Sequence, residues 1–177
     1  MQFTFLALNT FENTFEMVPM IKDKRVTVIG WKEWIAIPQL HIPFIKTKVD
    51  TGARTSSLHS FDLKVTTERG QKRAHFKVHP IQGRNDIVVA CSADVVDYRY
   101  ISDSGGHKEK RYVIVTPIVL DGIRWDVELT LANRETMSFR MLLGRSAMKN
   151  FIVEPSHSYL LGKPKGVLKT YSSRKKK

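Results

Sequence analysis

The 177-residue sequence lacks several features that would place it outside the ordinary globular proteins. It has a single cysteine, Cys91, so no disulfide can form within the chain and a cysteine-rich zinc site is excluded. No apolar run approaches the roughly 18 residues that a membrane helix needs. The first twenty residues contain no Lys or Arg, which a secretory signal requires. We therefore predict a cytoplasmic protein without a membrane partner.

Two common catalytic motifs are also missing. The sequence has no Gly-x-x-x-x-Gly-Lys-Ser/Thr phosphate loop and no His-Glu-x-x-His zinc motif. The best candidate for a metal-binding pair is His75 with His79, but these residues alternate like a strand that ends at Pro80. Residues i and i+4 of a strand lie about 13 Å apart, too far to bind one ion at about 2.1 Å. We predict no metal and no cofactor.

The chain is basic, and its excess of positive charge lies at the C-terminus. Lys and Arg number 29 against 17 Asp and Glu, a net charge of +12. Residues 163–177 hold seven of these cations and no acid. We expect 163–177 to be a flexible tail that contacts nucleic acid nonspecifically or only aids solubility. We expect residues 1–24 to be a loosely ordered extension, which leaves one domain over residues 25–162.

The residues between the two termini alternate in the manner of short strands, and turn residues separate them. Asp121-Gly122 lies between two alternating runs and predicts a two-residue hairpin. Only 145–150 is compatible with a helix. This pattern is typical of an all-β barrel or sandwich. The predicted strands are 26–30, 34–37, 44–49, 61–67, 74–78, 87–90, 95–100, 112–120 and 123–131.

The segment 50–53, Asp-Thr-Gly-Ala, carries the clearest signal for chemistry. The predicted strand 44–49 delivers the Asp50 carboxylate to a tight loop, where Gly52 gives the backbone freedom that a Cβ would remove. An Asx turn at the end of a strand explains the same residues without catalysis. A second segment is therefore needed to choose between the two interpretations.

The second segment is 141–145, Met-Leu-Leu-Gly-Arg, followed by a short helix-compatible stretch. The pair of segments resembles the retropepsin-like aspartic peptidases, in which the second motif packs beneath the active-site loop. The resemblance spans residues 44 to about 161 and implies a closed all-β barrel with one short C-terminal helix. Longer stretches are similar to a bacterial family named for ATP-dependent zinc proteases, whose members are associated with ATP-grasp enzymes that modify ribosomal protein S6. Those stretches are 29–34, 49–56, 76–80 and 139–145.

The resemblance implies an aspartic-type endopeptidase that hydrolyses peptide or protein substrates. Such catalysis needs two carboxylates about 3 Å apart that share a proton. Because the chain has one Asp-Thr-Gly, we predict a homodimer in which Asp50 meets the partner's Asp50. The implied site consists of the catalytic residues Asp50, Thr51 and Gly52, the substrate-binding residues Ala53 and Arg54, and the structural supports Leu143, Gly144 and Arg145.

The sequence departs from the retropepsin pattern after Ala53. Retropepsins have acids there that pair with the later arginine, whereas this chain has Arg54 and Thr55. We therefore expect Arg145 to pair with another acid, Asp126 or Glu128. Arg54 suggests a substrate with an acidic side chain or a C-terminal carboxylate, and a structural salt bridge is the alternative.

Three further points stay open at this stage. The turns at Gly70, Gly83 and Gly105-Gly106 are all candidates for a flap over the cleft. A zinc-dependent peptidase, as the family's name implies, is the first alternative function. The second is a non-catalytic dimeric binding module whose basic tail contacts RNA or ribosomes.

Overall fold

The computed structural model describes residues 26–102 and 106–172, and within them almost all regular structure is strand. The predicted mostly-β architecture is confirmed. The strands are β1 Thr27–Gly30, β2 Lys32–Ile37, β3 Ile42–Asp50, β4 Ser56–His59, β5 Phe61–Glu68, β6 Gln71–Val78, β7 Val89–Ser102, β8 Lys108–Leu120, β9 Ile123–Ala132, β10 Met141–Gly144 and β11 Phe151–Glu154. Two 3₁₀ turns, η1 Pro38–Leu40 and η2 Arg145–Ala147, and one helix, α1 Val167–Ser172, complete the described elements.

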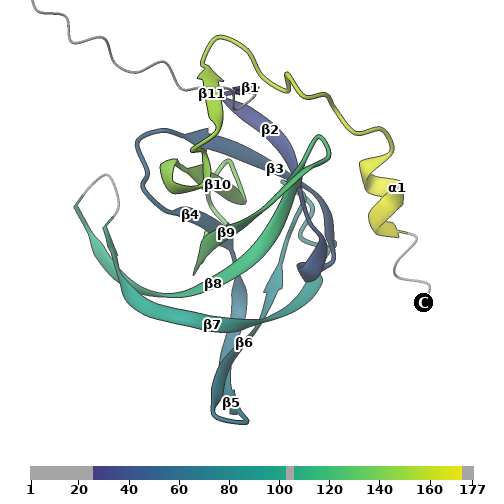
Figure 1. The fold of residues 1–177 in the computed structure, drawn as a ribbon. Helices are drawn as coiled ribbons and strands as arrows, with labels where there is room; N and C mark the ends of the chain where they lie inside the picture. The colour runs from purple at the N-terminus through teal and green to yellow at the C-terminus, as the bar shows by residue number, and fades with distance from the viewer. Residues whose placement is uncertain (1–25, 103–105, 173–177) are drawn as a thin grey trace, which may run out of the picture.

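Nine of the described strands form one curved sheet in the order β2-β3-β10-β4-β9-β8-β7-β6-β5 (Figure 1). A further contact pairs Ala36 of β2 with Val119 of β8. The part of the sheet that runs β2-β3-β10-β4-β9-β8 therefore curls around one interior. That contact comprises a single residue pair. The remaining strands β7, β6 and β5 continue outward, and the β5–β6 hairpin projects away from β10 (Figure 1).

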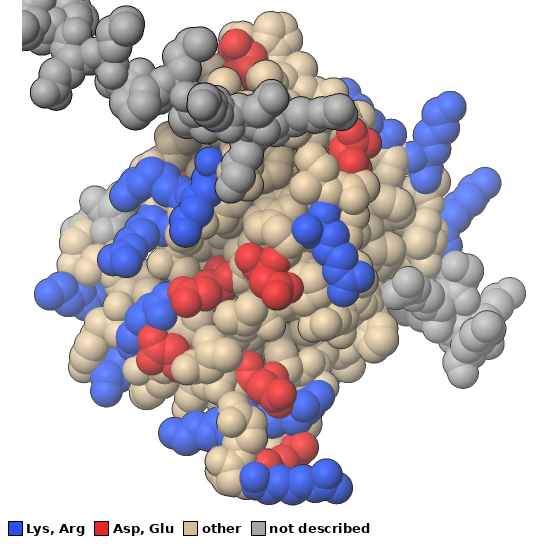
Figure 2. Space-filling view, in the orientation of Figure 1, with Lys and Arg blue, Asp and Glu red and all other residues tan. Residues whose placement is uncertain are grey.

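Charged side chains of both signs are mixed on the face of the molecule drawn in Figure 2. Several Asp and Glu side chains lie in the middle of this face, with Lys and Arg around and between them. Although the net charge is +12, this face therefore has no continuous cationic surface of the kind that binds a nucleic-acid backbone.

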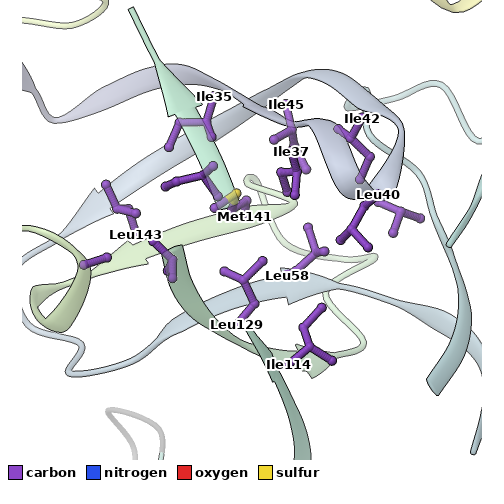
Figure 3. Packing of buried hydrophobic residues seen from close by; sticks show 14 of the residues in the cluster. Ile35, Ile37, Leu40, Ile42, Ile45, Leu58, Ile114, Leu129, Met141 and Leu143 are labelled. Carbon is purple, nitrogen blue, oxygen red and sulfur yellow. The ribbon is translucent and has the colours of Figure 1, made fainter. Parts of the chain in front are cut away.

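The interior of the curled sheet is filled by aliphatic side chains (Figure 3). Alternation explains this, since Ile35 and Ile37 of β2 face inward while Ala36 between them is more exposed. Met141 and Leu143 of β10 are fully buried in the same cluster. β10 is therefore anchored by its side chains as well as by its neighbours β3 and β4.

The helical segments differ from the prediction. Residues 145–150 were expected to be helical, but only the 3₁₀ turn η2 forms there, because Phe151 already begins the strand β11 that pairs with β1. The described helix is α1, within the segment expected to be a flexible tail. It is held by Tyr171, which is 4% exposed and whose hydroxyl donates a hydrogen bond to the Phe44 carbonyl at 2.5 Å.

The predicted extension at residues 1–24 lies outside the described residues, and so do the last five residues of the basic tail. Among the described residues, no helix has the length and apolar character needed to cross a bilayer.

Candidate active site

Asp50 is the last residue of β3, and its carboxylate is held by the loop that follows. Oδ1 accepts hydrogen bonds from the backbone N–H groups of Gly52 at 3.1 Å and Ala53 at 3.2 Å. Oδ2 lies 3.8 Å from Lys48 Nζ, and the Asp50 side chain is 25% exposed. The loop therefore has the geometry of an Asx turn, and it leaves Oδ2 without a hydrogen bond from any described residue.

The second motif lies directly beside this loop. β10 runs parallel to β3, with Leu143 opposite Val49 and Gly144 opposite Asp50. A Cβ at Gly144 would lie 2.6 Å from the carbonyl carbon of Thr55, so only glycine fits this approach. The N–H of Gly144 donates to Ser56 Oγ at 3.0 Å, which ties β10 to the start of β4.

Arg145 pairs with no acid among residues 26–102 and 106–172, and the expectation of Asp126 or Glu128 as its partner is wrong. Its Nη1 donates to the backbone carbonyls of Thr51 and Gly52, each at 2.8 Å. Glu128 instead pairs with Arg99, at 2.5 Å. In retropepsins, acids after the Asp-Thr-Gly-Ala segment pair with the arginine of the second motif. Here the carbonyl oxygens of Thr51 and Gly52 take their place as the partners of Arg145.

The backbone completes the connection between the two motifs. The N–H of Arg145 donates to the Ala53 carbonyl at 2.9 Å, and the N–H of Ser146 donates to the Arg54 carbonyl at 3.0 Å. The Arg54 side chain is exposed, and its guanidinium has no hydrogen bond or ion pair with any described residue. The structural salt bridge considered for Arg54 is thus not present in the described part of the chain.

Sequence patterns missed most of the loop 133–140, which connects β9 to β10 and carries Arg134, a residue that interacts electrostatically with Asp50. The rings of Phe139 and Trp31 meet edge to face at 6.0 Å, and the Trp31 carbonyl accepts a hydrogen bond from Val49 of β3. Burial lowers the pKa of Arg134, the Arg111 guanidinium on β8 lowers it further, and the Asp50 carboxylate opposes both. The signals in the sequence were the position of this loop directly before the Met-Leu-Leu-Gly-Arg motif and the family-like stretch 139–145, which includes its last two residues.

With this geometry in place, the comparison with known families is decisive. Residues 28–164 match the RimB-like family, described as "Retropepsin-like aspartic endopeptidase RimB". The chain belongs to this family. The predicted relationship to retropepsin-like peptidases is therefore confirmed.

Relatives of this RimB-like chain are larger proteins. It is 49% identical over 136 residues to a "Probable alpha-L-glutamate ligase" of Shewanella pealeana, covering 76% of this chain and 30% of the relative. It is 44% identical over 144 residues to a protein of the same name from Desulfotalea psychrophila, covering 81% of this chain and 31% of the relative. The chain thus spans about three tenths of the length of these relatives.

A solved structure shares the fold of the RimB-like chain. It is a Legionella pneumophila protein of unknown function, 23% identical, with a TM-score of 0.65. The match covers 76% of this chain and 98% of the other.

One group of side chains in the RimB-like chain has the composition of a metal site. His59, His79 and Glu135 offer ligand atoms that all lie within 4.8 Å of one another, and both histidines are buried. Zinc is commonly bound by such residues. Whether these three side chains could bind zinc is therefore a stricter test of the zinc-peptidase alternative than the absence of a zinc motif in the sequence.

The hydrogen bonds of His59 do not suit a metal. Its Nδ1 accepts the Arg134 N–H at 3.0 Å, so the proton of the neutral ring is on Nε2, which then has no lone pair for an ion. Burial, followed by the Arg140 guanidinium, lowers the pKa of His59 to about 4. The positive charge of Arg140 also opposes the binding of a metal cation beside His59. These residues do not fit zinc without loss of the Arg134 hydrogen bond.

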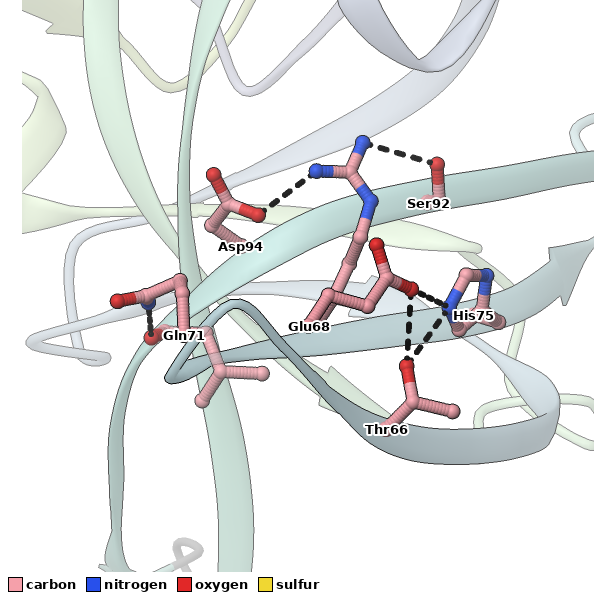
Figure 4. Close-up of polar contacts among 8 residues, drawn as sticks. Thr66, Glu68, Gln71, His75, Ser92 and Asp94 are labelled. Atoms are coloured by element: carbon pink, nitrogen blue, oxygen red, sulfur yellow. Dashed lines mark hydrogen bonds and ion pairs between the residues drawn. The ribbon is translucent and has the colours of Figure 1, made fainter.

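His75 and His79, the pair considered from the sequence, have different surroundings. His75 lies on strand β6, and its Nε2 is 3.1 Å from both Glu68 Oε1 and Thr66 Oγ1 (Figure 4). His79 Nδ1 lies 3.3 Å from Glu135 Oε1 instead. The two rings therefore serve separate polar clusters.

Proposed function

We propose that the chain is an aspartic endopeptidase that acts as a homodimer, with one catalytic carboxylate from Asp50 and the other from the partner's Asp50. Two observations support this: the match to the RimB-like family, and the partly exposed Asp50 carboxylate, which is anchored through Oδ1 while Oδ2 accepts no hydrogen bond from a described residue and lies 3.8 Å from Lys48 Nζ. The second observation carries the proposal at the level of residues.

In this dimer the two carboxylates share one proton, because two negative charges at contact distance are unfavourable. The ionised carboxylate takes a proton from a water molecule as that water attacks the peptide carbonyl carbon. The protonated carboxylate donates its proton to the carbonyl oxygen, which gives a tetrahedral intermediate. Collapse of the intermediate breaks the C–N bond as the amine leaves with a proton. Thr51 and Gly52 shape the loop that presents each Asp50, and Arg145 holds their carbonyls.

The β7–β8 hairpin is the flap in this proposal. Arg111 of β8 and the Asp50 carboxylate both act electrostatically on Arg134, which supports a place for this hairpin on the same side of the molecule as the carboxylate. The β5–β6 hairpin, with Gly70 at its turn, projects away from β10 (Figure 1). The flap would therefore approach the substrate from the side of β8.

The substrate in this proposal is an α-linked peptide rich in glutamate. The relatives that contain this segment are named alpha-L-glutamate ligases. Lys48 lies 3.8 Å from the Asp50 carboxylate, and Arg134 interacts electrostatically with Asp50, so both cations offer partners for acidic side chains. An endopeptidase with this preference would remove residues that a ligase of the ATP-grasp type adds, which links the two activities.

Asp50→Asn tests the catalytic proposal, since one substitution removes both carboxylates of the dimer. Cleavage of a fluorogenic oligoglutamate peptide should fall by about 10³-fold or more, as expected when a group that acts in proton transfer is lost. Asp126→Asn removes one exposed acid of β9 and should leave the rate unchanged. Sedimentation at several concentrations should show a dimer. Undiminished cleavage by Asp50→Asn, or full activity of a strict monomer, would contradict the proposal.

A further inference from the structure

The loop 133–140 is fixed from within by the guanidinium of Arg140, which is only 5% exposed. Nη1 of Arg140 donates hydrogen bonds to the carbonyls of Arg134, at 3.0 Å, and of Glu135. Nη2 donates to Asn85 Oδ1 at 3.3 Å, which ties the loop to the segment before β7. The backbone that carries Arg134 is thus held by a buried charged group and not by strand pairing.

Arg134 is held at three points and leaves its terminal nitrogens unused. Besides the carbonyl bound by Arg140, its N–H donates to His59 Nδ1, and its Nε donates to the Phe139 carbonyl at 3.3 Å. Neither Nη1 nor Nη2 makes a hydrogen bond or ion pair with any residue that the structure describes. A half-buried guanidinium is thereby oriented with two free donor groups.

The charges around Arg134 favour an anion at this position. The neighbouring Arg111 guanidinium is a like charge, and the Arg111 side chain is only 18% exposed. Arg111 has its own partner in Glu109, at 2.8 Å. Asp50 acts on Arg134 as an opposite charge. The loop is also fixed beside β3, because Phe139, whose carbonyl accepts from Arg134 Nε, packs on Trp31, and the Trp31 carbonyl accepts the N–H of Val49, the residue before Asp50. A second carboxylate placed here would satisfy the free N–H groups and reduce the repulsion between the two arginines.

We propose that Arg134 binds a side-chain carboxylate of the substrate, next to the peptide bond that is cleaved at Asp50. This inference rests on the proposed peptidase function and assigns its acidic preference to one residue. Arg140 and His59 act as positioning residues, because they fix the backbone from which Arg134 extends. Arg54, the candidate from the sequence, lies on the exposed side of the Asp50 loop without such support.

The test measures binding separately from cleavage. In the Asp50→Asn background, fluorescence anisotropy compares a labelled oligoglutamate peptide with an oligoglutamine peptide of equal length. The oligoglutamate should bind about 10- to 100-fold more tightly, as expected for charge-assisted hydrogen bonds. Adding Arg134→Gln should remove this difference. Adding Arg134→Lys should retain part of it, because the charge remains while the paired N–H donors are lost.

Arg84→Gln is the matched control, because it removes the same charge from a guanidinium paired with Asp86 outside the site. It should leave the preference for oligoglutamate unchanged. Melting temperatures report whether each variant folds. If Arg134→Gln does not fold, Arg134→Lys provides the test instead. The proposal is overturned if the Asp50→Asn protein binds both peptides equally, or if Arg134→Gln keeps the preference or Arg134→Lys keeps it in full. Failure of the peptidase function would be seen separately, as cleavage that Asp50→Asn does not reduce.

Discussion

Two loops converge on Asp50, and they are stabilised in different ways. The loop 50–55 is held by backbone groups: two N–H donors on Asp50, two carbonyls on Arg145, and a close approach of Gly144 to Thr55. The loop 133–140 is held by buried polar side chains, chiefly Arg140 and His59. The loop 50–55 depends on close backbone packing, and the loop 133–140 depends on the charge state of buried side chains. Added bulk should therefore destabilise the first loop, and a change of pH should destabilise the second.

Gly144→Ala should break the first loop and give the largest effect. The added Cβ would lie 2.6 Å from the Thr55 carbonyl carbon and 2.9 Å from the Arg54 oxygen, and backbone atoms cannot move aside cheaply. We expect a loss of about 3 kcal/mol in the free energy of unfolding, measured by urea denaturation. Gly122→Ala, which meets no heavy atom within 4 Å, should lose only about 1 kcal/mol through its positive φ of 78°. Equal losses in the two variants would show that the close approach is not decisive.

The sequence was informative about the first loop because both the loop and the segment that supports it have recognisable residue patterns. The segments 50–53 and 141–145 were singled out from their residue types, and the structure pairs Gly144 with Asp50. The carbonyl partners of Arg145 could not be predicted, since any backbone offers carbonyl groups. In the second loop only the last two residues, Phe139 and Arg140, fell in a family-like stretch. Arg134 could not be found from the sequence, because it is placed by His59 of β4, a neighbour only through the pairing of β4 with β9.

Acid should weaken the second loop while the first stays intact. Burial lowers the pKa of His59 to about 4 from 6.5, so between these values the unfolded chain binds a proton that the folded chain does not. Stability should therefore fall as the pH falls, by about 2 kcal/mol between pH 7 and pH 5. Protonation would also place a second N–H at Nδ1, against the N–H of Arg134. The groups that face His59 are Arg140, His79, Glu135 and Arg134.

Urea denaturation at several pH values measures this dependence. His59→Gln should lose the part of the slope that lies between pH 6.5 and pH 4, although the variant is less stable at neutral pH. His157→Gln replaces an exposed histidine and should retain the slope. If the slope of His59→Gln equals that of the unchanged protein, another group accounts for the acid sensitivity.

Arg145→Lys should give the smallest effect and sharpen the comparison. Arg145 Nη1 bridges the carbonyls of Thr51 and Gly52, but the side chain is exposed, so water can replace part of what it provides. We expect stability to fall by less than about 1 kcal/mol, while kcat falls several-fold because the loop that presents Asp50 is less well fixed. Arg124→Lys, at an exposed position near the start of β9, should change neither value. A loss of stability as large as that of Gly144→Ala would mean that this arginine, and not the close backbone approach, holds the Asp50 loop in place.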